Sequence, residues 1–265
     1  GKLGESFVLA SESCALDIIG ATFLREVENG EIVYIENNEL NSLKPFGEHK
    51  PRPCVFEYIY FSRPDSFLRG KTAYEYRKNL GKELAREDTV EADLVVPVPD
   101  SGNAAAIGYS HEKKINFELG LIRNHYVGRT FIEPGQQIRS LGVKLKLNAN
   151  KSCIEGKSII LVDDSLVRGT TSHKIVKMLY DAGAKEVHLR IACPEIKYPD
   201  FYGVDMPTKK ELLAANKSVE EICEYVQAKS LRFLSIKGLY KALGFQERNN
   251  TTPQLTDHYF TGEYP

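Results

Sequence analysis

Two adjacent carboxylates, Asp163 and Asp164, stand between an apolar run and a group of small hydroxylated residues. The apolar run, 159–162, has the composition of a strand buried on both faces, and ligands of open α/β sheets bind at the carboxyl ends of such strands. The group 169–172 (Gly-Thr-Thr-Ser) opens a predicted helix, where free backbone N–H groups hold a phosphate well. This order of strand, carboxylates and phosphate-binding loop predicts a site for a sugar phosphate.

The segment 158–172 resembles the motif with which type I phosphoribosyltransferases bind phosphoribosyl pyrophosphate (PRPP). The resemblance implies that the two acids hold the ribose hydroxyls and influence the metal, while the loop after them holds the 5′-phosphate. The PRPP-binding residues implied here are Asp163, Asp164, Ser165, Arg168, Gly169, Thr170, Thr171 and Ser172. The alternative is an Asp-Asp turn that caps an ordinary helix. A dinucleotide site is not expected, because no G-x-G-x-x-G follows a strand-like run.

A second turn of this kind lies earlier in the chain, where the apolar run 94–98 leads into Pro99-Asp-Ser-Gly102 and then a small-residue helix. Gly102 lets the backbone approach a ligand, and consecutive amides there can form a nest for an anion. The alternative is a simple strand-to-helix turn. Because the resembled family keeps its pyrophosphate loop here, Asp100, Ser101 and Gly102 are also expected to bind PRPP.

Magnesium is the cofactor that the resemblance implies. Ser101, Asp163 and Asp164 are the expected metal neighbourhood, by family position and because hard oxygen atoms suit Mg²⁺.

The segment 120–150 shows no convincing period of a helix or a strand, and it is rich in cations. Its cations include Arg123, Arg129, Arg139, Lys144 and Lys146. Loops of this length inside compact domains are usually lids or binding segments. We expect closure over a departing pyrophosphate, with Arg129, Lys144 and Lys146 as the catalytic cations. The alternative is a solvated basic surface.

Alternating elements must position these groups. From residue 54 onward the sequence predicts strands at 93–98, 158–162, 186–192 and 231–234, with helices at 72–86, 103–113, 209–216, 218–229 and 236–243 and one after 172. Such alternation predicts an α/β fold, a parallel sheet flanked by helices. Residues 5–50 instead show short alternating runs and turn signals such as Asn29-Gly30, typical of antiparallel hairpins. The end of the chain is polar and is expected to be irregular.

Composition narrows the class of protein. The 265 residues are 42% hydrophobic, and 35 basic against 36 acidic residues leave a net charge of −1, so neither nucleic acid nor an anionic membrane is an expected partner. No stretch approaches the roughly 20 apolar residues that span a bilayer, and no signal peptide is visible. We therefore expect a cytoplasmic protein whose five cysteines are reduced.

Further motifs narrow the resemblance to one enzyme family. Residues 11–17, 54–65, 96–102, 129–134 and 202–205 are similar to the glutamine phosphoribosylpyrophosphate amidotransferases, in the same order. The resemblance implies a glutaminase remnant plus linker at 1–50 and a phosphoribosyltransferase domain at 51–265. It also implies that ammonia displaces pyrophosphate from PRPP to give 5-phosphoribosylamine, the first committed step of purine synthesis. A homo-oligomer inhibited by purine nucleotides is expected, with glutamine supplying ammonia through the missing domain.

Two departures from the family pattern matter. The family's glutaminase nucleophile is an amino-terminal cysteine, whereas this chain starts with Gly1 and Cys14 does not match that position, so glutaminase activity is not expected. Many members also hold an iron–sulfur cluster through four cysteines. Only Cys54 is matched, because Asp200 stands at the second position and no cysteine lies near 260–262, so no cluster is expected.

Other functions stay open from the sequence. One is a nucleobase phosphoribosyltransferase, which would need a hood that reads the base; another is a PRPP-binding domain without turnover. The segment 193–205 occupies the hood position. Its aromatic residues Tyr198, Phe201 and Tyr202 are expected in the core, and a wall of the ammonia pocket is the alternative.

Overall fold

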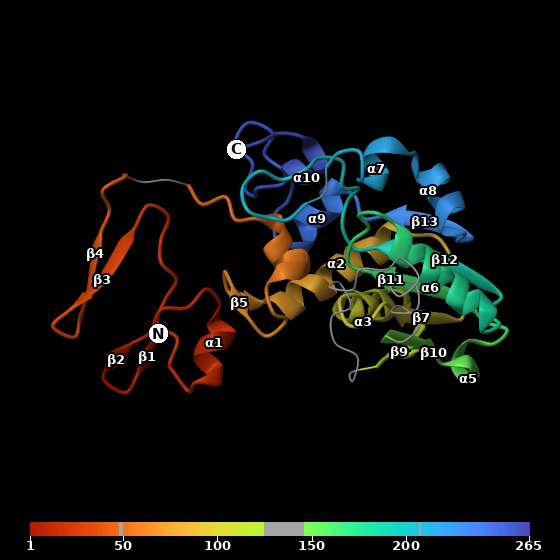
Figure 1. The fold of residues 1–265 in the computed structure, drawn as a ribbon, viewed down its shortest axis with the longest axis horizontal. Coiled ribbons are helices and arrows are strands. Elements are labelled where there is room, and N and C mark those ends of the chain that lie inside the picture. Colours follow the sequence, from red (N-terminus) through yellow and green to blue (C-terminus); the bar gives the residue numbers. More distant parts are fainter. Residues whose placement is uncertain (48–49, 125–145, 207) are drawn as a thin grey trace, which may run out of the picture. The chain divides into compact units, whose positions relative to one another are not determined.

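The computed structural model describes residues 1–47, 50–124, 146–206 and 208–265 of the chain (Figure 1). These residues form two compact units. The first comprises Gly1–Glu75 and Asn249–Thr256, and the second comprises Tyr76–Arg248 and Asp257–Pro265. The units are defined by packing alone, so the assignment of residues 1–50 to a glutaminase remnant stays a prediction.

The first unit contains short antiparallel ribbons. Its elements are β1 (Lys2–Leu3), β2 (Ser6–Phe7), α1 (Ser13–Ile18), β3 (Ile32–Glu36), β4 (Glu39–Leu43), the π-helix η1 (Glu57–Phe61), β5 (Phe67–Leu68) and β6 (Lys71–Thr72). Asn29-Gly30 forms a turn as its signal predicted, whereas the β3–β4 hairpin turns at Asn37 and Asn38. Both asparagines have positive φ, 50° and 60°, which asparagine tolerates and which tight hairpin turns require.

The carboxylate of Glu12, in the segment 11–17, binds residues at the end of the segment 54–65 and just after it. Glu12 Oε2 accepts hydrogen bonds from the Ser66 hydroxyl (2.6 Å) and from the backbone N–H of Arg63 (2.8 Å). Ser13 at the start of α1 accepts another from the N–H of Phe67 (2.7 Å). The motif at 11–17 therefore holds the turn that follows η1.

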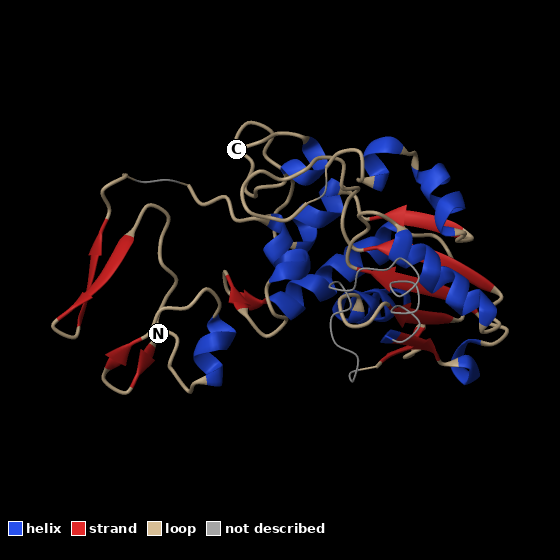
Figure 2. Cartoon of the chain, viewed as in Figure 1, coloured by secondary structure: helices blue, strands red, loops and turns tan. Residues whose placement is uncertain are grey.

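The second unit is built on a five-stranded sheet in the order β13-β12-β11-β7-β8 (Figures 1 and 2). All its neighbouring strands run parallel. The strands are β7 (Leu94–Pro97), β8 (Asn116–Phe117), β11 (Ser158–Asp163), β12 (Glu186–Ile191) and β13 (Ser230–Phe233). This confirms the predicted α/β architecture.

Burial explains why the central strands are so apolar. Every residue of β7 is buried, as are all residues of β11 and β12 after the first. Val162 of β11 pairs with Pro97 of β7, and Asp163 pairs with Ile191 of β12. Because the strands are parallel and in this register, their carboxyl ends meet at one edge of the sheet.

Helices flank the sheet, with α3 packed against β7 and β11 and α6 packed against β12 (Figure 2). The helices are α2 (Ala73–Glu87), α3 (Asn103–Lys113), α5 (Lys151–Ile154), α6 (Thr170–Asp181), α7 (Leu213–Asn216), α8 (Val219–Val226), α9 (Ile236–Ala242) and α10 (His258–Thr261). In the described ranges, no helix has the length and apolar character needed to cross a membrane.

Three segments differ from the predicted structure. The segment 120–150 was expected to lack strands, but β9 (Leu121–Arg123) and β10 (Leu147–Ala149) pair antiparallel at its two ends. The predicted helix 209–216 is reduced to α7, because the amide of Asn216 donates to the carbonyls of Lys209 (2.8 Å) and Leu212 (2.7 Å) and holds the preceding residues in a turn.

The third difference is at the chain end, which contains α10 and buried polar residues. His258 Nε2 donates to Asp200 Oδ1 (2.8 Å), and both side chains are fully buried. Tyr259 accepts through its carbonyl from the N–H of Lys197 (2.9 Å), so this end holds the segment at the hood position. Contrary to expectation, Phe201 and Tyr202 of that segment are exposed, at 73% and 61%.

Candidate functional site

The acid pair lies at the carboxyl end of β11. Asp163 is the last residue of the strand, and both aspartates are only 7% exposed. Asp163 Oδ1 accepts hydrogen bonds from the backbone N–H of Asp164 (2.9 Å) and from the hydroxyl of Ser101 (3.3 Å). Asp164 Oδ2 accepts one from the hydroxyl of Ser165 (2.8 Å). Donors from two separate loops therefore converge on the pair.

Burial dominates the electrostatics of this pair. Loss of solvent raises the pKa of Asp163 well above its usual value, and the neighbouring charge of Asp164 raises it further. Both effects disfavour a second negative charge in a small buried volume. The pair is therefore suited to ligands that bring hydroxyl donors or positive charge.

The predicted pyrophosphate loop is held directly against the end of β11. The N–H of Val98 donates to the carbonyl of Val162 (2.8 Å), and the N–H of Gly102 donates to the carbonyl of Val98 (2.8 Å). A Cβ at Gly102 would lie 2.3 Å from the Val162 carbonyl oxygen, so only glycine permits this approach. The peptide bond between Pro99 and Asp100 is cis. The loop thus brings Ser101 to the acid pair.

Asp100 has a partner that the sequence did not suggest. Its carboxylate forms an ion pair with Arg123 of β9, and both side chains are about half exposed. The predicted pyrophosphate loop is therefore connected to the strand that leads into the predicted lid. Such a pair presents a cation beside the loop without burying it.

The predicted phosphate loop ends at the start of α6. Gly169 is the residue before the helix and has φ of 72°, a left-handed conformation that glycine adopts without strain. Thr170 and Thr171 are exposed in the first turn of the twelve-residue helix, whereas Ser172 is buried. Exposed hydroxyls and the first N–H groups of a helix of this length are the donors that a phosphate needs.

Arg168 of this loop is exposed, and its guanidinium contacts a carboxylate. Nη2 and Nε donate to Oε1 of Glu211, at 3.1 and 3.2 Å. Glu211 was not singled out from the sequence. It precedes α7 and is separated from the loop along the chain, so no local pattern indicates the contact.

The predicted lid cations can be placed only in part. Lys146 is half-buried, and its carbonyl accepts a hydrogen bond from the N–H of Asn124 (2.8 Å). Arg129 and Lys144 lie outside the described residues, as does Arg139. Their catalytic role stays a prediction.

Cys193 is a neighbour of the acid pair that sequence reasoning missed. It follows β12 and is completely buried. Burial raises the pKa of its thiol well above the usual value, and the charges of Asp164 and Asp163 raise it further. The thiol is therefore neutral at neutral pH.

Comparison with known proteins shows which enzymes this chain is similar to. An amidophosphoribosyltransferase of Rhizobium etli is 56% identical over 271 aligned residues, covering 100% of this chain and 55% of that protein. One of Bacillus subtilis is 50% identical, covering 100% of this chain and 56% of its own length. Over its whole length, the chain is therefore similar to amidophosphoribosyltransferases. It thus spans little more than half the length of these relatives. A comparison with models of protein families found no match.

Solved structures show the same similarity. The glutamine PRPP amidotransferase of B. subtilis, solved in complex with ADP and GMP, matches 96% of this chain with a TM-score of 0.88 at 50% identity. The chain covers 56% of that structure. A second structure, described as the allosteric regulatory enzyme of purine biosynthesis, matches with a TM-score of 0.87. The expected type I phosphoribosyltransferase fold is confirmed.

The residues present fit a magnesium ion that is bound together with substrate. Two carboxylates and the Ser101 hydroxyl provide hard oxygen atoms at one place. Within the part of the chain that the structure describes, no group of three or more His, Cys, Asp or Glu side chains is arranged to hold a metal. Mg²⁺ usually keeps waters and substrate phosphates in addition to one or two carboxylates, so the set suits an amidophosphoribosyltransferase whose substrate completes the coordination.

One position at which many amidophosphoribosyltransferases have a cysteine ligand of an iron–sulfur cluster is occupied here by Asp200. Asp200, at the second position, accepts hydrogen bonds from His258 Nε2 and from the N–H groups of Tyr202 and Val204, each at 2.8 Å. A carboxylate engaged in three hydrogen bonds is no substitute for a cysteine thiolate. We keep the absence of a cluster as a prediction.

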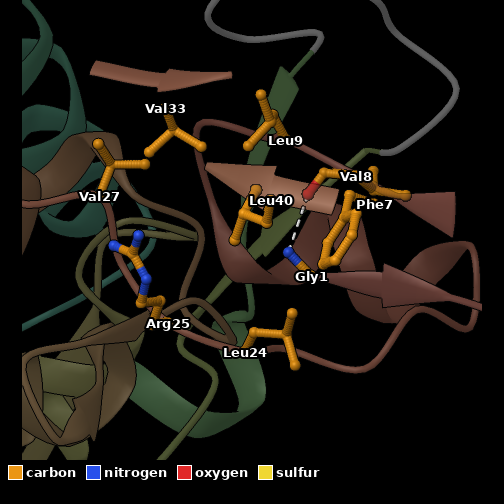
Figure 3. Close-up of a pocket in the computed structure, with 9 residues that line it drawn as sticks. All are labelled: Gly1, Phe7, Val8, Leu9, Leu24, Arg25, Val27, Val33 and Leu40. Carbon is orange, nitrogen blue, oxygen red and sulfur yellow. Dashed lines mark hydrogen bonds between the residues drawn. The ribbon is translucent and has the colours of Figure 1, made fainter. Parts of the chain in front are cut away.

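A pocket in the first unit has a different chemistry from the acid-pair site (Figure 3). Its walls are apolar, apart from Arg25 and the amino group of Gly1, which donates to the carbonyl of Val8 (2.8 Å). Arg25 is paired with Glu31, its Nη1 donating to Oε2 at 2.8 Å. No hydroxyl or carboxylate side chain is among the described residues that line the pocket, so it lacks the acceptors that bind ribose hydroxyls at the acid pair.

Proposed function

We propose that this chain is the transferase part of an amidophosphoribosyltransferase. In this reaction ammonia displaces pyrophosphate from PRPP and gives 5-phosphoribosylamine, the first committed step of purine synthesis. The observation that carries the proposal is the contact between Ser101 and Asp163, which joins the two anion-binding loops at a buried acid pair. Similarity to the family supports the choice of ammonia as the nucleophile.

Each part of PRPP has a matching group. The ribose hydroxyls donate to the carboxylates of Asp163 and Asp164, and the 5′-phosphate receives N–H and hydroxyl donors from residues 169–172. The pyrophosphate lies on the turn that contains Asp100 and Ser101, because the N–H of Gly102 is already bonded to the carbonyl of Val98. Ser101 and the acid pair would hold Mg²⁺, which would supply positive charge that stabilises the departing pyrophosphate. These assignments use the positions described above.

The reaction breaks the bond from C1 of the ribose to the pyrophosphate oxygen and forms a bond from C1 to the ammonia nitrogen. Negative charge develops on the departing pyrophosphate, so donors and cations aimed at it lower the barrier. The cations proposed for this task are Arg129, Lys144 and Lys146. Ammonia is nucleophilic only when it is neutral, so the site also has to exclude water while the bond forms.

The wider function is inferred from the family. The solved B. subtilis relative binds ADP and GMP, and by analogy purine nucleotides are the proposed feedback inhibitors of this chain. We also propose a homo-oligomer, a cytoplasmic location, and glutamine as the source of ammonia in the whole enzyme. Cys14 is 4% exposed in α1, which supports the prediction that these 265 residues do not hydrolyse glutamine themselves.

Release of pyrophosphate from PRPP tests the proposal. The chain is incubated with PRPP and Mg²⁺, and release is compared for an ammonium salt at alkaline pH, glutamine at neutral pH, and a panel of nucleobases. We expect release with ammonium alone, because only the alkaline arm supplies neutral ammonia. The product is then identified as an aminosugar phosphate by mass spectrometry.

The other arms separate the competing functions. Release with a nucleobase but not with ammonium would identify a salvage-type phosphoribosyltransferase. Binding of PRPP without release in any arm would support the domain without turnover. Release with glutamine would contradict the prediction about glutaminase activity, and failure to bind PRPP would exclude the proposed site altogether.

A further inference from the structure

Arg168 is the cation of the predicted phosphate loop, and one carboxylate holds it. Its Nε and Nη2 both donate to Oε1 of Glu211, at 3.2 and 3.1 Å. In the described part of the chain, its guanidinium makes no other hydrogen bond. A guanidinium carries five N–H donors, so the contact with Glu211 leaves donors available for an anion.

Glu211 is itself fixed in place. Its other oxygen, Oε2, accepts hydrogen bonds from the hydroxyl (3.2 Å) and the N–H (3.3 Å) of Thr208. The turn that contains both residues is braced by the side-chain amide of Asn216, which donates to the carbonyls of Lys209 and Leu212. Glu211 therefore belongs to a braced turn. Its Oε1 accepts from Arg168, and its Oε2 accepts from Thr208.

The same region contacts the phosphate loop at two further points. The N–H of Leu213 donates to the carbonyl of Val167 (2.9 Å), directly before Arg168. On the other side of Arg168, a Cβ at Gly169 would lie 2.5 Å from a methyl group of Leu213 and 3.1 Å from the ring of Tyr225. The residues before and after Arg168 are thus held by the segment that also holds its guanidinium.

We propose that Glu211 is a positioning residue for the 5′-phosphate of PRPP and that it acts through Arg168. This inference rests on the proposed function, because it concerns the same sugar-phosphate site. The contact with Glu211 restricts the rotamers of a long side chain before the ligand arrives, and such preorganisation lowers the cost of binding. Without Glu211, Arg168 must be ordered by the ligand itself.

The 5′-phosphate is remote from the reacting atom C1, and this determines how loss of Glu211 should change KM and kcat. The 5′-phosphate does not change during attack at C1, so an interaction with it stabilises ground state and transition state alike. Loss of Glu211 should therefore raise KM for PRPP and leave kcat nearly unchanged. A contact that only maintained the fold would lower the fraction of active protein and hence kcat.

The test uses two fragments of the substrate. Ribose 5-phosphate carries the 5′-phosphate without pyrophosphate, and magnesium pyrophosphate carries the leaving group alone. We expect Glu211→Ala to weaken binding of ribose 5-phosphate about two- to fivefold, the range of exposed ion pairs, with pyrophosphate binding unchanged. Glu211→Gln, which keeps an oxygen acceptor for the guanidinium, should give a smaller effect. Calorimetry measures each dissociation constant.

Two controls make the result specific. Asp181→Ala removes another exposed, ion-paired carboxylate, from α6, where Asp181 pairs with Lys177 (2.9 Å), and it should change neither constant. In the Arg168→Ala background, Glu211→Ala should have no further effect, because coupled residues are not additive.

Three outcomes count against the account. Unchanged or tighter ribose 5-phosphate binding in Glu211→Ala would overturn the inference, as would equal weakening of both fragments. Failure of the unsubstituted chain to bind either fragment would instead overturn the proposed function.

Discussion

Asp163 is a carboxylic acid in surroundings that disfavour its charge. It is buried beside Asp164, and its pKa is raised well above the usual value by burial first and by the neighbouring acid second. A sugar with two adjacent hydroxyls and a divalent cation would relieve both effects. The raised pKa therefore marks a binding site more directly than the identity of the residue does.

The same shift predicts how stability depends on pH in the metal-free protein. The pKa of Asp163 in the folded state lies above its ordinary value of 3.8. Between these two pKa values the folded protein keeps the proton on Asp163, whereas the unfolded protein has lost it. The contribution to stability is thus present at acid pH and is lost as pH rises through the folded pKa. Asp163→Asn keeps an acceptor for Ser101 without the charge, so we expect a higher melting temperature than the unsubstituted protein at pH 7.

Thermal unfolding in a chelator, followed across the acid range to pH 7, checks this prediction. The difference between the two proteins should shrink as pH falls below 3.8, where Asp163 becomes protonated in both states. Asp181→Asn, an exposed carboxylate on α6, is the matched control and should show no such trend. A variant that melts below the unsubstituted protein at pH 7 would contradict the assignment of a raised pKa.

The sequence predicted those site residues that lie together in one continuous motif. Asp163, Asp164 and the Gly169 turn stand in one continuous motif, so their proximity needed no knowledge of the fold. Cys193 and Glu211 come close to the site only through the sheet and the turn before α7. No spacing along the chain encodes those contacts, and so they were missed.

The elements explain why two loops form one site. β7 and β11 are parallel neighbours, so the turn after each strand emerges at the same edge of the sheet. Gly102 allows the first turn to approach the end of the second strand, with 2.3 Å between a hypothetical Cβ and the Val162 carbonyl oxygen. The close approach is what puts Ser101 within reach of Asp163.

A substitution at Gly102 should therefore separate the loops. Gly102→Ala forces its Cβ against backbone, an overpacking that typically costs about 1–3 kcal/mol of stability. We expect weaker binding of magnesium pyrophosphate with a smaller change for ribose 5-phosphate, the reverse of the pattern for Glu211→Ala. Denaturant unfolding measures the first effect and calorimetry the second. Equal affinity for pyrophosphate in the two proteins would show that this turn is not its binding loop.

The secondary structure was predictable where the pattern of apolar residues was clear. β7, β11 and β12 are buried on both faces and read as continuous apolar runs, and α3 and α6 follow turns rich in small residues. The predicted helix 209–216 is present only as α7, from Leu213 onward, because the side chains of Asn216 and Glu211 bond to a turn before it. Short ribbons such as β9 and β10 have too few residues for a period to show.

At the scale of the whole molecule, the chain combines two packing units, and the predicted PRPP site lies within the second. All its described residues come from that unit, so PRPP binding is a property we expect of that unit. We propose that ammonia is supplied from glutamine only in the whole enzyme, because this chain spans little more than half the length of its relatives. Ammonium salt replaces that supply in the assay.

The most direct measurement is the ammonia-dependent rate of pyrophosphate release by Asp164→Asn, compared with the unsubstituted chain and with Asp181→Asn. Removal of one charge from the acid pair should lower the rate by at least about tenfold, since a group that stabilises developing charge typically contributes that much or more. The melting temperature of Asp164→Asn should not fall, because Asn can still accept from Ser165. An unchanged rate in a variant that binds PRPP normally would remove Asp164 from the site and contradict the account.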